Sequence, residues 1–364
     1  VHGALQQLPL SVSGAFNAHD RDGDGQPSIS TSGLTLSHGP NHLTAQGKVR
    51  DEWQMGLSVD IADLSQSLPM LTGVIRGDVR LGGPFAHPNA KLAIHAKQLR
   101  WQDLHINQLT LDGELALKDT LGGNLNVSVL GGRYQTLRFD HLDLAVRGDE
   151  AEHQLDLRWQ GTPASGALSI QGALARETGW RGQLLDTQVS VEDIGDIVQQ
   201  TAAPIAFTFA DKQTQVGEHC WQWQATSLCL SQPAHIGEQG EVVAKIEGFD
   251  AKQIAAFMPP EWQVETRANA AVHARWQPDA SPDVRASIDI ADGAMSQQAE
   301  RPLVIDWQHA NVDVRWQNDQ LQGALALTLE DGGTLASGFT LTDLLTPTRA
   351  ITGDLTVTAV QLAK

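Results

Sequence analysis

The chain has 364 residues, 41% of them hydrophobic, and 43 acidic residues against 25 Lys and Arg give it a formal net charge of −18. Such a length and hydrophobic content are enough to bury a large core, so the chain is a folded protein. The acidic balance excludes nucleic acid as an expected partner, because phosphate binding needs clustered Lys and Arg and none cluster here.

The residue pattern typical of β-strands is present from the first residues. The opening, VHGALQQLPLSVSGAF, already reads as strand, with no secretory signal peptide and no apolar run long enough for a membrane helix. We therefore expect a fragment of a longer chain.

The next segment, HDRDGDGQPSIST, places Asp20, Asp22 and Asp24 as in the opening of a calcium-binding loop. The twelfth position is Thr31 instead of a bidentate Glu, and the flanking segments read as strands instead of helices. An Asp- and Gly-rich hairpin turn is the favoured interpretation, and calcium is the alternative.

Alternation of apolar and polar residues dominates the rest of the chain, which predicts strands with one apolar face. Turn signals about every 8 to 12 residues predict roughly 25 to 30 strands. Polar neighbours such as Asp143, Asp156, Asp289, Arg315 and Thr328 fall on the opposite phase. The apolar phase of these strands includes Leu92, Ile94, Leu142, Leu144, Val146, Leu155, Leu157, Ile288, Ile290, Val312, Val314, Leu325, Leu327 and Leu329.

Two segments of the sequence are loosely similar to each other. HPNAKLAIHAKQL begins at residue 87, and SPDVRASIDIADGAM begins at residue 281. Each stands after a break in the alternation, so we interpret it as the start of a new meander. Breaks with a candidate acidic N-cap, a short apolar segment and a Pro or Thr-Pro stop predict short helices near 60–70, 191–203, 249–262 and 341–348.

The two cysteines, Cys220 and Cys229, lie symmetrically about Gln224 and Ala225 in HCWQWQATSLCLSQP. If this segment is a hairpin, they are cross-strand neighbours at disulfide distance, which would mean an oxidising compartment. The alternative is two buried thiols.

An antiparallel sheet with one apolar face has to keep that face away from water. It can pack against a second sheet as a sandwich, close into a barrel or curl into a trough. The alternation does not decide among them. Since no linker or composition break divides the chain, we favour an all-β fold in which residues 1–364 form one long curled antiparallel sheet. This sheet would make a taco-like groove with an apolar interior, interrupted by a few short helices.

The chain resembles the TamB family, and more broadly the AsmA-like and bridge-like lipid transfer proteins. The segments that carry the resemblance are GGPFAHPNAKLAIHAKQLRWQDLHINQLTLDGEL, SPDVRASIDIADGAM, FDAKQIAAFMPPEW and the LCLSQP hairpin. It implies a tapered β-groove, phospholipid transport between membranes, a role in outer-membrane protein or autotransporter assembly, and contact with the outer-membrane barrel TamA. It also implies a periplasmic location and an inner-membrane anchor, and we expect the anchor and the TamA contact to lie outside this fragment.

No catalytic signature is present. The sequence has no HExxH, GxSxG, GxxxxGK[ST] or strand-to-helix GxGxxG motif, and its 13 His are dispersed. We expect no enzymatic activity, no metal and no cofactor.

The expected function is to shield phospholipid acyl chains in the groove. The alternatives are a scaffold that templates client strands at a sheet edge, and a secreted carbohydrate-binding module. The ten Trp are scattered, and Trp159, Trp276 and Trp316 each precede a Gln at a strand end, so packing at strand ends explains them better than a sugar platform.

Overall fold

The computed structural model describes residues 2–5, 8–19, 28–68, 70–253, 259–298, 303–342 and 350–359. All 26 strands belong to one sheet, and every strand pairing recorded in it is antiparallel, as in β7–β8 and β22–β23. The predicted all-β class is confirmed, and the strand number lies within the range that the turn spacing predicts. The chain divides into two compact units, residues 1–175 with 189–192, and residues 176–188 with 193–364.

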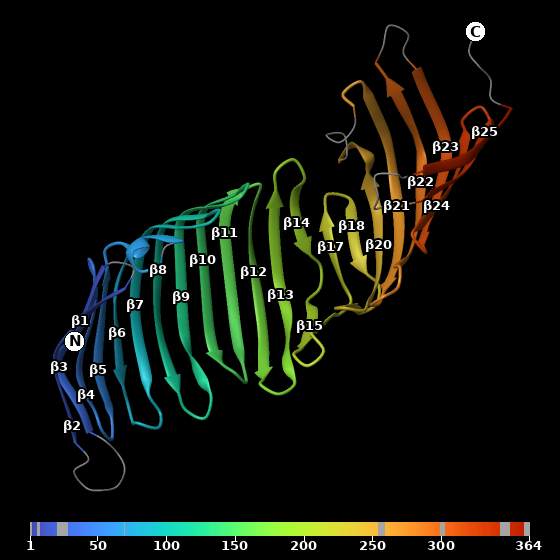
Figure 1. Cartoon of the computed structure of the whole chain (residues 1–364). Helices are drawn as coiled ribbons and strands as arrows, with labels where there is room; N and C mark the ends of the chain where they lie inside the picture. The colour runs from blue at the N-terminus through green and yellow to red at the C-terminus, as the bar shows by residue number, and fades with distance from the viewer. Residues whose placement is uncertain are drawn as a thin grey trace. The chain divides into compact units, whose positions relative to one another are not determined.

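The first unit is a meander in which each strand pairs with the next along the chain (Figure 1). The local cause is the alternation itself, because side chains of neighbouring residues point to opposite faces of a strand. Its strands are β1 (His2–Leu5), β2 (Leu8–His19), β3 (Ser28–His38), β4 (Asn41–Val49), β5 (Trp53–Ile61), β6 (Leu71–Gly82), β7 (Asn89–Trp101), β8 (Leu104–Leu117), β9 (Leu121–Tyr134), β10 (Leu137–Asp149), β11 (His153–Thr162) and β12 (Ala164–Ala175).

The second unit begins with β13, whose last three residues cluster with the first unit. Between β13 and β20 its short strands follow two routes, since β14 pairs with β17 and β18 with β20, while β15 pairs with β16 and β19 with β20. Its strands are β13 (Gly179–Val191), β14 (Gly195–Gln199), β15 (Ala203–Thr208), β16 (Gln213–Val216), β17 (His219–Trp223), β18 (Thr226–Leu230), β19 (Ala234–Ile236), β20 (Gly240–Asp250), β21 (Trp262–Trp276), β22 (Asp283–Gln297), β23 (Leu303–Gln317), β24 (Gln320–Leu329), β25 (Thr334–Thr342) and β26 (Ala350–Thr358).

Only part of the predicted helical breaks is seen. A 3-10 turn, η1 (Leu64–Gln66), lies in the first break, and residues 251–253 form a 3-10 turn in the third. Residues 254–258 and 343–349 lie outside the described part of the chain, so the helix predicted in the fourth break and the central residues of the third stay predictions.

The helix expected near 191–203 is wrong. Residues Gly195–Gln199 form β14 instead, because Val198 and Gln199 pair with Gln222 and Trp221 of β17. Asp193 and Gly195 have φ of +66° and +97°, which turns the chain between β13 and β14. Backbone pairing with a distant strand prevails over the local helical pattern.

The two loosely repeated phrases both form long strands, β7 and β22. Among the described residues no helix is long and apolar enough to cross a membrane. Whether the two units share one groove stays a prediction.

Candidate functional site

The candidate site of the first unit is the apolar face of its sheet. Strand pairing places an apolar residue of each strand beside an apolar residue of the next strand, which makes a row across the sheet. In β6 the position in this row is held by Gly77, which has no side chain. This central row crosses β2 to β12 through Val12, Leu36, Leu43, Val59, Gly77, Ile94, Leu111, Val127, Leu144, Leu157 and Leu168. No charged residue interrupts it.

A parallel apolar row lies on each side of the central row. One contains Ala96, Leu109, Val129, Leu142 and Trp159. The other contains Leu57, Val79, Leu92, Gly113, Leu125, Val146, Leu155 and Ile170. All seven residues that the sequence assigns to the groove in this unit therefore share one face.

The opposite phase is polar, as predicted. Asp143 and Asp156 lie on it, beside Arg158 and Ala145 in the pairing of β10 with β11. The Ser169 hydroxyl donates to Asp156 at 2.6 Å and lowers the pKa of that carboxyl, so it stays ionised at neutral pH. A sheet face that carries charged side chains of this kind is expected to be exposed to water.

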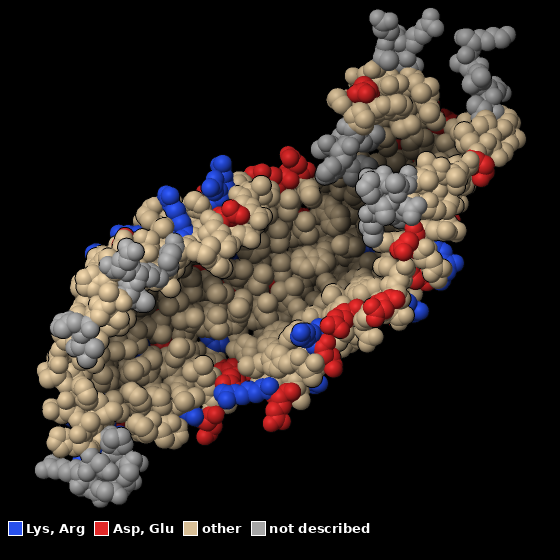
Figure 2. All heavy atoms as spheres, in the orientation of Figure 1, with Lys and Arg blue, Asp and Glu red and all other residues tan. Residues whose placement is uncertain are grey.

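The apolar face is hollowed and uncovered. Figure 2 shows the first unit with a concave face almost free of Lys, Arg, Asp and Glu, which gather along the strand ends. Since the rows contain no charge, the concave face is the apolar one. Leu36 and Leu43 of the central row are 38% and 41% exposed, so water reaches side chains that a filled core would enclose.

Accessible surface supports the same conclusion for the whole chain. It exposes 23138 Å², whereas two separate globules of half its mass would together expose about 17,000 Å². In the described ranges nine hydrophobic residues are buried, and five of them are alanines. The large aliphatic side chains therefore line a surface and do not fill an interior.

The second unit has an equivalent apolar face. Strand pairing sets Ile288, Val312 and Leu325 in one row, Ile290, Ala310 and Leu327 in the next, and Ala286 and Val314 in a third. Leu329 follows Leu327 by two residues on β24, lies beside Trp307, and is buried. Asp289, Arg315 and Thr328 take the other phase.

The predicted disulfide is present. Cys220 of β17 and Cys229 of β18 are paired cross-strand residues, their Cα atoms are 4.1 Å apart, and their sulfurs are bonded. The turn falls at Gln224 and Ala225, and Gln224 has a φ of +51°. The bond links the two strands of the β17–β18 hairpin, which has five residue pairs.

Several candidate features of the sequence do not form a site. Asp20, Asp22 and Asp24 lie outside the described residues. Within the part that the structure describes, no three His, Cys, Asp or Glu gather as a metal would require. The indole N–H groups of Trp159 and Trp276 donate to the backbone oxygens of Ala164 and Gly237, so these rings are fixed at strand ends.

Sequence reasoning missed two features of the first unit. His38 and Asn41 are buried and hold η1 against the sheet. The central row also contains apolar residues that the sequence analysis did not assign to the groove, and the same alternation could have found them: Val12, Leu36, Leu43, Val59, Leu111, Val127 and Leu168.

Comparison with known proteins identifies the family of the chain that carries these faces. The family model described as the N-terminal domain of TamB matches residues 1–364. The chain belongs to the TamB family. The translocation and assembly module subunit TamB of Haemophilus influenzae is 26% identical over 374 residues, which cover 100% of this chain and 28% of that protein.

The chain thus spans just over a quarter of that TamB relative. No solved structure matches it. The predicted resemblance to TamB is confirmed.

Proposed function

We propose that the apolar faces of this TamB-family chain hold phospholipid acyl chains and shield them from water while the head groups stay at the open side. The observation that supports this is the central row of the first unit, where apolar side chains follow one another across β2 to β12 and remain partly exposed. A protein that needed this face only for its own stability would cover it.

The energetics suit passage along the sheet better than tight capture. Each buried CH₂ group gains about 0.8 kcal/mol, so partly engaged acyl chains gain several kcal/mol against water. Successive strands offer similar aliphatic side chains, so one position differs little from the next in free energy. Lipid can then move along the rows over low barriers.

We also propose a cellular location and partners for this activity. The relative's name, translocation and assembly module subunit, places that protein in an assembly system. We infer a periplasmic position for this chain, an inner-membrane anchor and contact with the barrel TamA through other parts of the full protein, and a contribution to outer-membrane protein assembly. The Cys220–Cys229 disulfide fits an oxidising compartment.

A test in the first unit uses adjacent residues on opposite faces. Ile94 lies in the central row, whereas His95 is exposed on the other face beside Arg76 and Thr110. Ile94→Glu puts an unpaired charge among acyl chains, which is costly to desolvate. We expect lipid co-purifying with the chain, measured by mass spectrometry, to fall at least about fivefold, a loss of roughly 1 kcal/mol.

His95→Glu is the matched control and is expected to keep its lipid. Thermal melts show whether each variant is folded. A folded Ile94→Glu protein that carries as much lipid as the unaltered chain would contradict the proposal.

A further inference from the structure

One end of the first unit's strands carries a row of basic side chains. Arg100 of β7 stands beside His105 of β8, His105 beside Arg133 of β9, and Arg133 beside Arg138 of β10. The three arginines are exposed. Like charges directly opposite each other destabilise a sheet, so this arrangement opposes folding and calls for another explanation.

These arginines have no acidic partner in the described part of the chain. Several basic residues elsewhere are paired, as Arg76 is with Asp60 at 2.9 Å, Lys91 with Glu114 at 2.6 Å and Arg275 with Glu241 at 2.7 Å. Two acidic residues are near the row in sequence, Asp103 in the β7–β8 turn and Asp140 in the β10 bulge, and neither forms an ion pair with it among the described residues. Cations thus gather unpaired on a chain of net charge −18.

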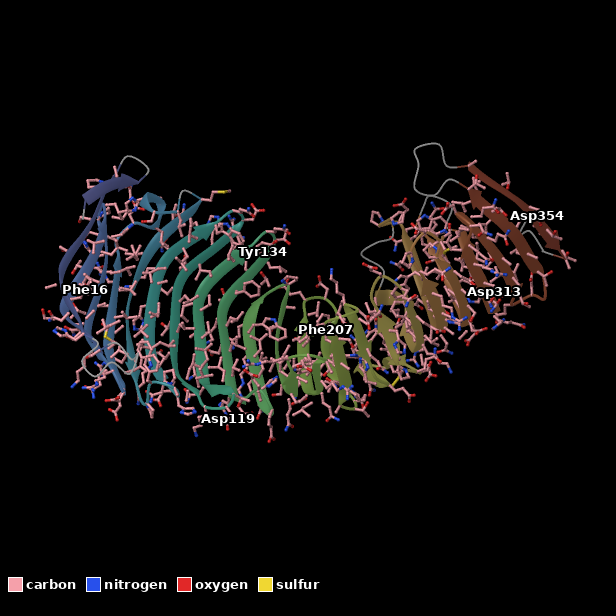
Figure 3. The ribbon with its side chains drawn as sticks, turned by 60° about the horizontal axis from the view of Figure 1, so that its bottom comes forward. Phe16, Asp119, Tyr134, Phe207, Asp313 and Asp354 are labelled. Carbon is pink, nitrogen blue, oxygen red and sulfur yellow. A yellow bond between two sulfur atoms is a disulfide. The ribbon has the colours of Figure 1, made fainter. Side chains whose placement is uncertain are left out.

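An apolar row lies one residue away from the basic one along each strand, at the same strand ends but on the opposite face of the sheet. Leu71, Trp101, Leu104, Tyr134 and Leu137 are neighbours in the pairing of β6 to β10. Trp101 is 52% exposed and Tyr134 47%. Figure 3 shows Tyr134 at this end of the strands and Asp119 at the opposite end.

The apolar row opens into a hollow of about 490 Å³ lined by Leu68, Met70, Leu71, Leu99, Trp101, Leu104 and Ile106. Its lining has no charged residue. Met70, one of the lining residues, is 70% exposed. Figure 2 shows Lys and Arg projecting from the same edge of the unit.

We propose that this edge is an entry site that selects anionic phospholipids, with an acyl chain in the Leu68–Ile106 hollow and the head-group phosphate against Arg100, Arg133 and Arg138. The inference rests on the proposed function and adds to it a substrate class and a place of entry. Arginine suits the role because its guanidinium donates two hydrogen bonds to a phosphate, and its long stem reaches around a strand end. The adjoining hollow favours a phosphate that carries a hydrocarbon chain over a free anion.

The test compares phosphatidylglycerol and phosphatidylcholine that carry the same fluorescent acyl chain, titrated with the purified 364-residue chain. The unaltered chain is expected to bind the anionic lipid about tenfold more tightly, which corresponds to about 1.4 kcal/mol. The triple variant Arg100→Gln, Arg133→Gln, Arg138→Gln should lose this preference and keep its affinity for phosphatidylcholine. Removing like charges from exposed positions should leave it folded, and Arg133→Gln alone, at the centre of the row, should show a smaller loss in the same direction.

The matched control is Arg80→Gln, Arg147→Gln, Arg158→Gln, which removes the same charge from the same face of the unit at positions farther from the strand ends that border the hollow. It is expected to keep the preference for phosphatidylglycerol. If both triple variants lose that preference equally, net charge is responsible and the entry site is refuted.

The other outcomes separate this inference from the proposed function. Equal binding of the two lipids by the unaltered chain overturns the entry site and leaves the acyl-chain groove standing. Absence of binding to either lipid overturns both. Competition by glycerol phosphate at the same concentrations would reveal a plain anion site, and flotation with intact phosphatidylglycerol vesicles without binding of single lipids would reveal surface docking. Either result overturns the entry site.

Discussion

At the scale of single residues, the edge of the first unit depends on a small polar network. Asn41 is 3% exposed, donates to the backbone oxygen of Asp63 at 2.7 Å, and accepts from the Asp63 N–H at 3.0 Å. Ser67 joins Asn41 and His38 at 2.9 Å each. Because η1 precedes Leu68 and Met70, this network fixes the residues that border the apolar hollow.

Asp63 is the N-cap of η1, and its carboxylate accepts from the Ser65 hydroxyl and backbone N–H and from Gln66. These bonds, the Ser65 hydroxyl foremost, hold the pKa of Asp63 below its ordinary value. A lowered pKa means that the stabilisation is present above the unfolded-state value and is lost as pH falls through the folded-state value, here below about pH 4.

We predict that Asp63→Ala speeds amide exchange at Ser65, Ser67 and Leu68 by about three- to tenfold at neutral pH. In the unaltered chain, exchange at the same amides, corrected for intrinsic rates, should rise as pH falls below the ordinary Asp pKa. Asp60→Ala, which removes an exposed partner of Arg76, is the control and should leave these amides unchanged. Equal exchange in Asp63→Ala and the unaltered chain would refute the role of the cap.

At the scale of elements, the strands β14 to β19 are the shortest of the second unit's sheet. The β17–β18 hairpin has five residues on each side, and β18 also pairs with β20. Short strands make few ladder hydrogen bonds, so a covalent link between them has a large effect relative to their other interactions. The disulfide therefore acts where the sheet divides into two routes.

Replacing both Cys220 and Cys229 by Ser is expected to lower the free energy of unfolding by about 2 to 3 kcal/mol, the chain-entropy value for so short a loop. Urea denaturation measures it. Reducing agent should lower the stability of the unaltered chain by the same amount and leave the double variant unchanged. Free thiols in peptide maps of protein expressed in an oxidising compartment would contradict the bond.

At the scale of the whole molecule, the proposed transport makes every strand of the path necessary. In a filled core, a charge lowers stability in proportion to its burial. In a path for lipid, one charge stops movement although most of the sheet remains intact. The two cases differ in whether folding and transport are lost together.

Leu327→Asp in the second unit is expected to reduce lipid transport by full-length protein to near the background of a deletion strain while the protein remains folded and abundant. Thr328→Asp changes the neighbouring residue on the other face and should be silent. Outer-membrane integrity and lipid exchange in cells, with protein level and thermal melting, give the comparison. Normal transport by folded Leu327→Asp would exclude a path at this position.

The sequence by itself determined the β class and the face that each alternating residue takes, and it predicted the Cys220–Cys229 pairing with two buried thiols as the alternative. These follow from local spacing, because side chains alternate every residue along a strand and a hairpin of known centre pairs its two sides symmetrically. The family resemblance came from whole segments of the sequence.

Only the tertiary structure decided that residues 195–199 form a strand, that the apolar faces stay uncovered, that the chain divides into two units, and that Arg100, Arg133 and Arg138 form one row. The reason is that backbone hydrogen bonds between strands and the register they impose join residues far apart in sequence. The arginines cluster through the pairing of β7 to β10, and no local window of the sequence contains that pairing.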